Sequence, residues 1–243
     1  MDKNNKIKLQ KKNILIIDSK NDIKESQLKY IKKNKISIIL ISKNIKNLKK
    51  YKKIVKNISL YPINTKYLDQ NELKALHHII KIKYKNLNGI IFNTTEIEKL
   101  KPFDQFSINE WNKIIKNNFI NILIVIKELI IMLKKNSSIT FILYKQKKIS
   151  KAYFGAHACA NSSLISLMNI INDEYSSIKN IRINGISLEN INIEYKNNTH
   201  TYENKTKTIN IDKIIKICLF LIKGKYYKIK NKIFSSKNIT ISK

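Results

Sequence analysis

The stretch Trp111–Leu133, WNKIIKNNFINILIVIKELIIML, carries the clearest helical pattern in the chain. Apolar residues recur in it at steps of three and four, which is the period of one face of an α-helix. These residues are Trp111, Ile114, Ile115, Ile122, Val125, Ile126, Leu129 and Leu133. Because the stretch also contains Asn121, Lys127 and Glu128, it falls short of a membrane span. The pattern predicts a long amphipathic helix of a globular domain.

Short apolar runs lie on both sides of this helix and alternate with further amphipathic stretches. The runs are typical of buried strands and cover Asn13–Ile17, Ile36–Ile41, Ile58–Ile63, Gly89–Phe92, Ile139–Leu143 and Ile181–Ile186, with another candidate at Tyr226–Phe234. Further helices are expected over Ala152–Ser177 and Asp212–Ile222. Strands that alternate with helices favour βαβ units. The pattern predicts an α/β fold, a doubly wound parallel sheet of about seven strands with helices on both faces and a ligand crevice at the carboxyl ends of the strands.

The chain is expected to form a single domain over residues 1–243. It has 243 residues, 43% of them hydrophobic, which is enough to bury a full core, and no linker or internal repeat divides it. Residues 1–11 form a basic N-terminal extension without the apolar run of a signal peptide, so we expect a cytoplasmic protein with no membrane partner. The polar segment Asn190–Thr208 has little periodicity, and we expect it to be a mobile loop near the substrate.

The composition is strongly biased towards Ile, Lys and Asn, and the formal net charge is +31. These residues have A/T-rich codons, so our hypothesis is that the bias reflects an A/T-rich genome. A basic surface binds nucleic-acid phosphates without specificity. The Lys residues are spread along the chain with no Arg cluster and no aromatic-plus-basic motif, so we expect no specific nucleic-acid partner. A nucleic-acid-binding function is the least favoured alternative.

Metal and disulfide chemistry have little support. The two cysteines, Cys159 and Cys218, form no CxxC pair. His77 and His78 are adjacent on a helical stretch, where neighbouring side chains point in different directions. We therefore expect no metal site.

Several stretches resemble the short-chain dehydrogenase/reductase family from end to end, and within it the YciK-type oxidoreductases. Trp111–Leu133 is similar to the family's fourth helix, with its N-terminal Trp and mid-helix Asn. Tyr153–Tyr175, YFGAHACANSSLISLMNIINDEY, resembles the active-site helix, and Ile181–Ile186, IRINGI, resembles the strand that follows it. The resemblance implies a Rossmann-like domain and an NAD(P)-dependent oxidoreductase that acts on a carbonyl or alcohol. It also implies a homodimer or homotetramer that assembles through these two helices.

The resemblance places the cofactor contacts on residues that depart from the family pattern. In its first turn the family has a TGxxxGxG loop whose glycines let the backbone approach the pyrophosphate, and here Asp18, Asp22 and Lys24 fill the glycine positions. A carboxylate about 4 Å from a phosphate charge costs on the order of 4 kcal/mol at an effective dielectric constant near 20. Further contacts with NAD(P) fall on Lys43, Asn64 and Asn93, which stand where the family has an Arg, an Asp and the first Asn of an NNAG turn.

The catalytic positions depart further. The family's Asn, Ser, Tyr and Lys fall on Asn118, Tyr144, His157 and Asn161, so only Asn118 matches. In the family the Tyr is the general acid/base, the Lys lowers its pKa, the Ser polarises the substrate and the Asn organises a proton relay. His157 can donate a proton near neutral pH, whereas Asn161 cannot supply the positive charge.

These substitutions leave three interpretations. The first is an active NAD(P)-dependent oxidoreductase, whose rewired site uses Tyr144 as the acid and His157 as its partner. The second, which we favour, is a non-catalytic subunit or scaffold on the same fold. The third is the nucleic-acid-binding protein considered above.

Overall fold

The computed structural model describes residues 12–18, 25–33, 36–42, 48–64, 68–94, 100–144, 152–188, 191–196, 201–206, 211–222 and 228–235. The strands are β1 (Asn13–Asp18), β2 (Ser37–Ile41), β3 (Ile58–Tyr61), β4 (Leu87–Asn93), β5 (Leu133–Tyr144), β6 (Arg182–Leu188), β7 (Ile191–Lys196), β8 (Thr201–Thr206) and β9 (Lys232–Ser235). The α-helices are α1 (Glu25–Lys33), α2 (Leu48–Ile54), α3 (Gln70–Tyr84), α4 (Ile108–Ile115), α5 (Asn121–Leu129), α6 (Gly155–Ile178) and α7 (Ile211–Ile222).

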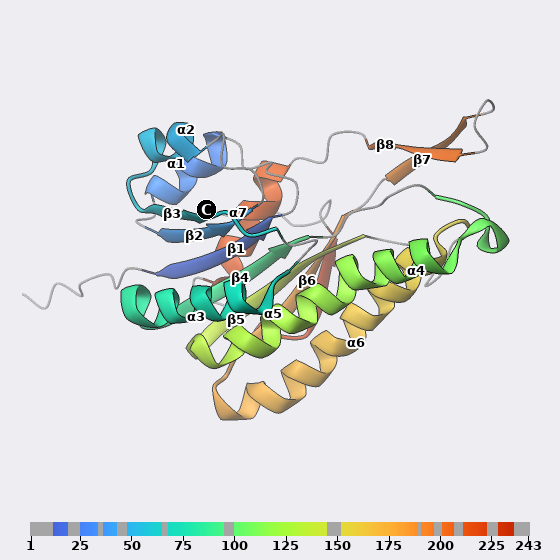
Figure 1. Cartoon of the computed structure of the whole chain (residues 1–243). Helices are drawn as coiled ribbons and strands as arrows, with labels where there is room; N and C mark the ends of the chain where they lie inside the picture. The colour runs from blue at the N-terminus through green and yellow to red at the C-terminus, as the bar shows by residue number, and fades with distance from the viewer. Residues whose placement is uncertain are drawn as a thin grey trace, which may run out of the picture.

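Seven strands form one parallel sheet in the order β3-β2-β1-β4-β5-β6-β9. The chain starts in the middle with β1, builds outward to β3, returns to the other side of β1 with β4, and then builds outward again (Figure 1). This is the doubly wound topology that the sequence predicts. The direction of building reverses between β1 and β4, and ligands of such sheets bind at the carboxyl ends of the strands at this point.

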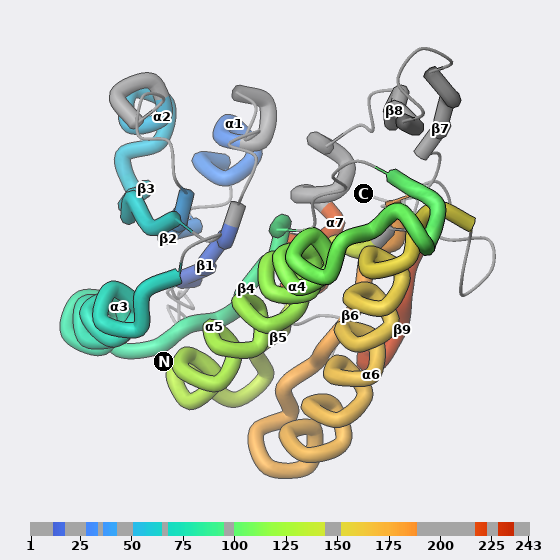
Figure 2. Tube along the Cα trace, turned by 45° about the vertical axis from the view of Figure 1, so that its right-hand side comes forward, coloured from blue at the N-terminus to red at the C-terminus, as the bar shows by residue number. Residues whose placement is uncertain are grey.

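Helices cover both faces of the sheet. One face carries α3, α4, α5 and α6, and the other carries α1, α2 and α7 (Figures 1 and 2). Because successive strand residues point to opposite faces, Leu15 and Ile17 pack under the first set of helices, while Ile14 and Ile16 pack under the second. A strand that is buried on both sides needs apolar residues at every position, which is why β1 reads as a continuous apolar run.

The long helix predicted over Trp111–Leu133 is confirmed as an unbroken run of helical residues from Ile108 to Met132, but the helix type changes along it. It begins with α4 and passes through a π-helical segment, η2 (Lys116–Ile120), into α5, and then ends in a 3₁₀ turn, η3 (Ile130–Met132). Leu133 lies outside the helix because its backbone pairs with Leu87 of β4 at the start of β5. Its spacing of four from Leu129 fits a helical face, and for that reason the sequence pattern placed it in the helix.

The expectation that Asn190–Thr208 forms a loop is wrong for the part that the structure describes. Ile191–Lys196 and Thr201–Thr206 pair as the antiparallel strands β7 and β8. The sequence INIEYK alternates apolar and polar residues, which is a strand pattern, but its partner strand is almost entirely polar and masks the signal.

The remaining predictions agree with the structure within a few residues. The helix expected over Ala152–Ser177 is α6, and the strand candidate at Tyr226–Phe234 narrows to β9. Residues 1–11 lie outside the described part of the chain. Among the described residues, no helix combines the length and apolar character that a membrane crossing requires.

Candidate functional site

The carboxyl ends of β1 and β4 bring two of the predicted cofactor positions together. Asp18 is the last residue of β1 and Asn93 is the last residue of β4, and their backbones are paired in the register of the two strands. Asn93 is half-buried, and for Asp18 the structure describes the backbone only. The Asp18 and Asn93 positions therefore lie side by side at the point where the sheet order reverses.

Two hydroxyl groups that sequence reasoning did not single out lie at the same edge. Ser42 follows β2 and Thr94 follows β4, and both side chains are buried. Neither hydroxyl has a hydrogen-bond partner among the described residues. A buried unpaired hydroxyl is costly, so a polar ligand at this edge would satisfy both groups. Serine and threonine are too common beside strands for the sequence alone to have marked these two.

The start of α6 carries two of the predicted catalytic positions. His157 and Asn161 are four residues apart on this helix, so their side chains lie on the same face. His157 is only 7% exposed, and Asn161 is partly buried. Because α6 follows β5 in a parallel sheet, its first turn lies near the carboxyl ends of the strands. The structure therefore brings His157 and Asn161 together.

The π-helical segment η2 carries the fourth position. Asn118 lies in this segment and is 3% exposed, and η2 packs against α6. Single π-helical turns inside helices occur frequently at functional sites, because they redirect one side chain without breaking the helix. The segment that contains Asn118 therefore packs against the helix that carries His157.

Helix α4 packs closely against the first turn of α6. A methyl group added at Gly155 would lie 3.0 Å from the Trp111 ring. Phe103 and Phe106 make edge-to-face contacts with the same ring, with ring centroids 5.8 and 6.0 Å away. Aromatic packing thus fixes the N-terminal turn of α6, on which His157 lies.

The other predicted positions are less well placed. Tyr144 is the last residue of β5, and the structure describes its backbone, paired with Leu188, but not its side chain. Asn64 is half-buried beyond the end of β3, two strands away from β1. Asp22, Lys24 and Lys43 lie outside the described residues.

Metal binding finds no support in the described part of the chain, where no group of three or more His, Cys, Asp or Glu residues could hold an ion. His77 instead contacts Glu128, with 2.5 Å between Nδ1 and Oε1, and this contact joins α3 to α5.

Cys159 is exposed and Cys218 is buried, and burial raises the pKa of the Cys218 thiol far above its ordinary value. A thiol with such a pKa is inert.

The family model for short chain dehydrogenases matches residues 12–204. The chain belongs to the short chain dehydrogenase family. The matched range runs from β1 into β8 and therefore includes every predicted catalytic and cofactor position. No curated protein sequence matches this one.

Solved structures show the same fold. The yciK oxidoreductase from E. coli has a TM-score of 0.76 at 17% identity, with 93% of this chain and 95% of that chain covered. A short chain dehydrogenase from Shigella flexneri 2a str. 301, complexed with NADP, has a TM-score of 0.75 at 17% identity, with 93% and 97% covered. A short-chain type dehydrogenase/reductase from Mycobacterium ulcerans has a TM-score of 0.73 at 14% identity, with 92% and 87% covered. The likeness to the yciK structure confirms the resemblance drawn from the sequence.

The family typically binds NAD(P), so the residues of this chain can be tested against that group. The carboxyl ends of β2 and β4 fit it, because Ser42 and Thr94 offer hydroxyls there that have no partner among the described residues. The first turn of α6 does not fit, because a neutral Asn161 stands where the family has a Lys. The strand ends therefore suit an NAD(P) molecule, whereas the start of α6 lacks the positive charge that the family uses there.

Proposed function

We propose that this member of the short chain dehydrogenase family is a non-catalytic subunit that has lost hydride transfer. The observation that carries the proposal is the pair His157 and Asn161, which share the buried start of α6 where the family has its Tyr and Lys. A general acid needs a pKa matched to its task and a positioned partner that maintains it. Asn161 has no charge to give, and the imidazole of His157 ends closer to its backbone than a phenol oxygen would.

The first turn of the domain supports the same conclusion. Asp18 and Asp22 place carboxylates where the family presents glycine to a pyrophosphate. The repulsion of on the order of 4 kcal/mol for one such contact corresponds to roughly a thousandfold loss of affinity. NAD or NADP would then bind weakly, despite the hydroxyls of Ser42 and Thr94.

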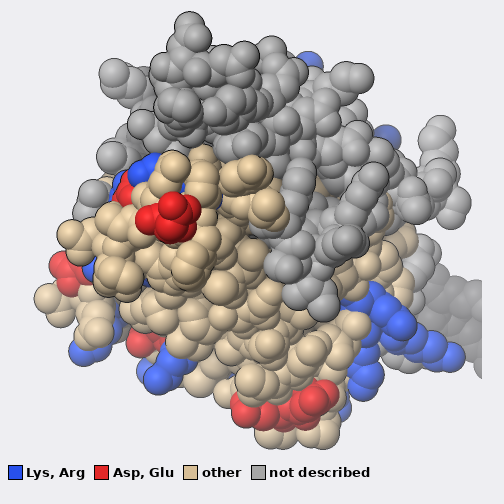
Figure 3. Space-filling view, turned by 90° about the vertical axis from the view of Figure 1, so that its right-hand side faces the viewer, with Lys and Arg blue, Asp and Glu red and all other residues tan. Residues whose placement is uncertain are grey.

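The surface of α6 supports a role in assembly. About one residue in five of the chain is Lys or Arg, yet the 24 residues of α6 include neither. Its exposed positions are neutral, apolar or acidic: Cys159, Ser166, Asn169, Ile170, Asp173, Glu174, Ser177 and Ile178. Figure 3 looks at the side of the molecule where α4 and α6 begin, and most of the described surface there is neither basic nor acidic. Interfaces are depleted in Lys, so we propose that α5 and α6 pair with a second copy in a homodimer.

Titration with NADH and NADPH by calorimetry, at low and at moderate salt, tests the loss of chemistry. Low salt alone would mislead, because a protein of net charge +31 attracts any polyanion. We expect no saturable binding at moderate salt and no oxidation of either nucleotide with a panel of carbonyl compounds. Micromolar binding that survives moderate salt, together with turnover that His157→Phe abolishes, would instead establish a rewired enzyme.

A further inference from the structure

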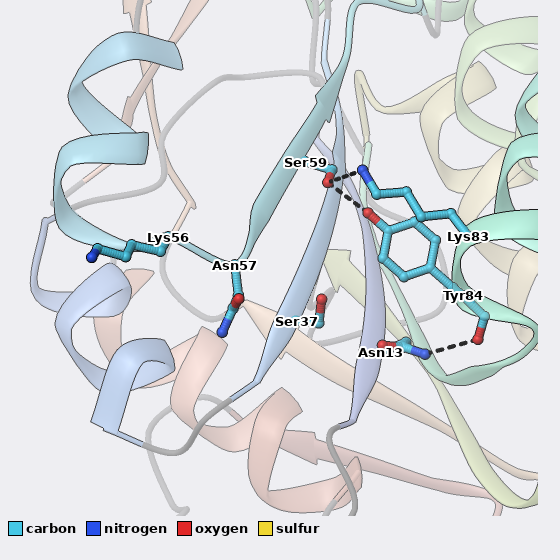
Figure 4. Close-up of a pocket in the computed structure, with 7 residues that line it drawn as sticks. All are labelled: Asn13, Ser37, Lys56, Asn57, Ser59, Lys83 and Tyr84. Carbon is cyan, nitrogen blue, oxygen red and sulfur yellow. Dashed lines mark hydrogen bonds between the residues drawn. The ribbon is translucent and has the colours of Figure 1, made fainter.

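A polar pocket of about 400 Å³ opens at the amino ends of β1, β2 and β3, beside the C-terminal end of α3 (Figure 4). It lies at the opposite edge of the sheet from the carboxyl ends of β1 and β4, so neither the proposed crevice nor α6 contributes to it. Its volume falls in the range of about 300–1,000 Å³ that is typical of small-molecule sites. No carboxylate is among the side chains that line it.

Ser59 is the centre of the hydrogen bonds in this pocket. Its Oγ accepts a hydrogen bond from the Tyr84 hydroxyl at 2.5 Å and another from the Lys83 ammonium at 3.3 Å. A serine hydroxyl has two lone pairs and one proton, so both acceptor positions are filled and only the proton is left. The Ser59 hydroxyl can therefore still donate one hydrogen bond to a ligand, but it cannot accept another.

Tyr61 lies beside Tyr84. Burial raises the pKa of Tyr61 to about 12, and the neighbouring Tyr84 adds to that rise. The Tyr61 phenol therefore stays protonated near neutral pH and adds no negative charge beside the pocket.

Ser37 supplies a second donor on the neighbouring strand. Its side chain is 5% exposed at the first residue of β2, and its hydroxyl makes no hydrogen bond with the residues that the structure describes. Lys83 has two more N–H protons beyond the one given to Ser59. In Figure 4 the side chains of Lys83 and Tyr84 converge on Ser59, Ser37 lies on the neighbouring strand, and Lys56 points away from them.

The C-terminal end of α3 would by itself repel an anion, because its last carbonyl groups carry partial negative charge. Asn13 counters this. Its Nδ2 donates to the carbonyl oxygens of Tyr84 and Asn86, both at 3.1 Å. The carbonyls of Tyr84 and Asn86 are thus occupied, and Lys83 brings a positive charge to the same end of the helix.

We propose that this pocket binds the phosphate group of a small molecule or free inorganic phosphate, with Ser37, Ser59 and Lys83 as its donors. Charge-assisted hydrogen bonds to phosphate oxygens are roughly twice as strong as neutral ones, and Lys83 supplies the positive charge among the residues that line the pocket. The site is independent of the dinucleotide crevice and of the proposed loss of hydride transfer.

The test compares the melting temperature in inorganic phosphate with that in chloride at matched ionic strength, since any anion screens a basic protein. Lys83→Gln removes a donor of the pocket, and Lys81→Gln, an exposed lysine on the same helix that does not line it, removes the same charge. We expect a phosphate-specific rise for the wild type and for Lys81→Gln. In Lys83→Gln and in Ser59→Ala, the apparent Kd for phosphate should increase about tenfold or more.

Equal phosphate shifts in Lys83→Gln and Lys81→Gln would overturn the proposal, and so would the absence of any shift beyond that in chloride. A titration with phenyl phosphate separates the two sources of the ligand. Tighter binding of the monoester than of inorganic phosphate assigns the pocket to a phosphorylated small molecule, and the reverse order assigns it to free phosphate. Because no dinucleotide is present, these results stand whatever the NADPH titration shows.

Discussion

Arg182 donates a hydrogen bond from Nη1 to the carbonyl oxygen of Leu221 at 2.7 Å, which ties β6 to the last turn of α7. Its Nη2 donates to the carbonyl of Asn136 in β5 at 3.2 Å. The side chain is 0% exposed, and burial lowers the pKa of the guanidinium without making it titrate near neutral pH. Arg182 is also the only arginine of the chain. A planar fork that reaches two carbonyls from one buried position is something a lysine cannot reproduce.

Replacing Arg182 by lysine should therefore lower the free energy of unfolding. The ammonium is a single donor centre and cannot reach both carbonyls, so we expect a loss of about 2–3 kcal/mol, the range of one or more charge-assisted hydrogen bonds. Urea denaturation followed by circular dichroism measures it. The matched control is Lys81→Arg on the exposed face of α3, which should change stability by less than about 0.5 kcal/mol. Equal midpoints for the two variants would show that the buried fork is dispensable.

Glu110 gives the protein an acid-sensitive contribution to stability. It closes a capping box at the start of α4, where its carboxylate accepts from the Ser107 backbone N–H at 3.0 Å and also contacts the Lys101 ammonium. The Lys101 hydrogen bond, followed by that of Ser107, lowers the pKa of Glu110 from 4.5 to about 2. Because the folded pKa is the lower one, the contribution is present above pH 4.5 and is lost as the pH falls towards 2.

Denaturation of the wild type and of Glu110→Gln across this pH range checks the prediction. The variant should be less stable above pH 4.5, and the two curves should converge as the pH approaches 2. Ser107→Ala is the control, because the Ser107 hydroxyl caps the Glu110 N–H at any pH, so its loss should be visible throughout. A constant gap between the wild type and Glu110→Gln would contradict the assigned ion pair.

The face of α6 predicts a dimer that a single charge should disrupt. Ile170 is 54% exposed on this lysine-free helix, and Ile82 is 68% exposed on α3, on a different part of the same helical layer. We expect sedimentation velocity to show a dimer for the wild type and for Ile82→Lys, and a monomer for Ile170→Lys, because a charge in an interface core must be desolvated. A monomeric wild type at micromolar concentration would remove the proposed interface.

The fold could be predicted from the sequence because burial on both faces leaves a strong signal. β1 and β2 are continuous apolar runs, and their order with the helices determines a doubly wound sheet. The apolar pattern gives a wrong prediction at Leu133, which has helical spacing but pairs with Leu87 as a strand residue. It also misses β8, because that strand is almost entirely polar. The functional positions are harder still. Asp18 and Asn93 could be brought together from the expected topology, whereas Ser37 and Ser59 form a pocket through packing that no spacing in the sequence reveals.

Restoring glycine to the first turn should recover dinucleotide binding if Asp18 and Asp22 are what prevents it. We expect Asp18→Gly/Asp22→Gly to bind NADPH at moderate salt, with an affinity up to roughly a thousandfold above that of the wild type, since the carboxylate–phosphate repulsion is removed. The control Glu72→Gln/Asp104→Asn removes the same two charges at exposed positions on α3 and in the turn before α4. Calorimetric Kd values that fall equally in both double variants would show that the effect comes from net charge alone.

The glycine variant also separates binding from chemistry. It should still fail to transfer hydride, because His157 and Asn161 remain at the start of α6. Adding His157→Tyr and Asn161→Lys restores the family's acid and its cation, so turnover should appear only in the combined variant, measured as oxidation of NADPH by a panel of small carbonyl compounds. His157 is buried, so the larger tyrosine side chain has to fit into a packed region. Folding of each variant is therefore checked by its thermal transition. Turnover in the glycine variant without these two changes would assign the acid to this chain's own residues and refute the loss of chemistry.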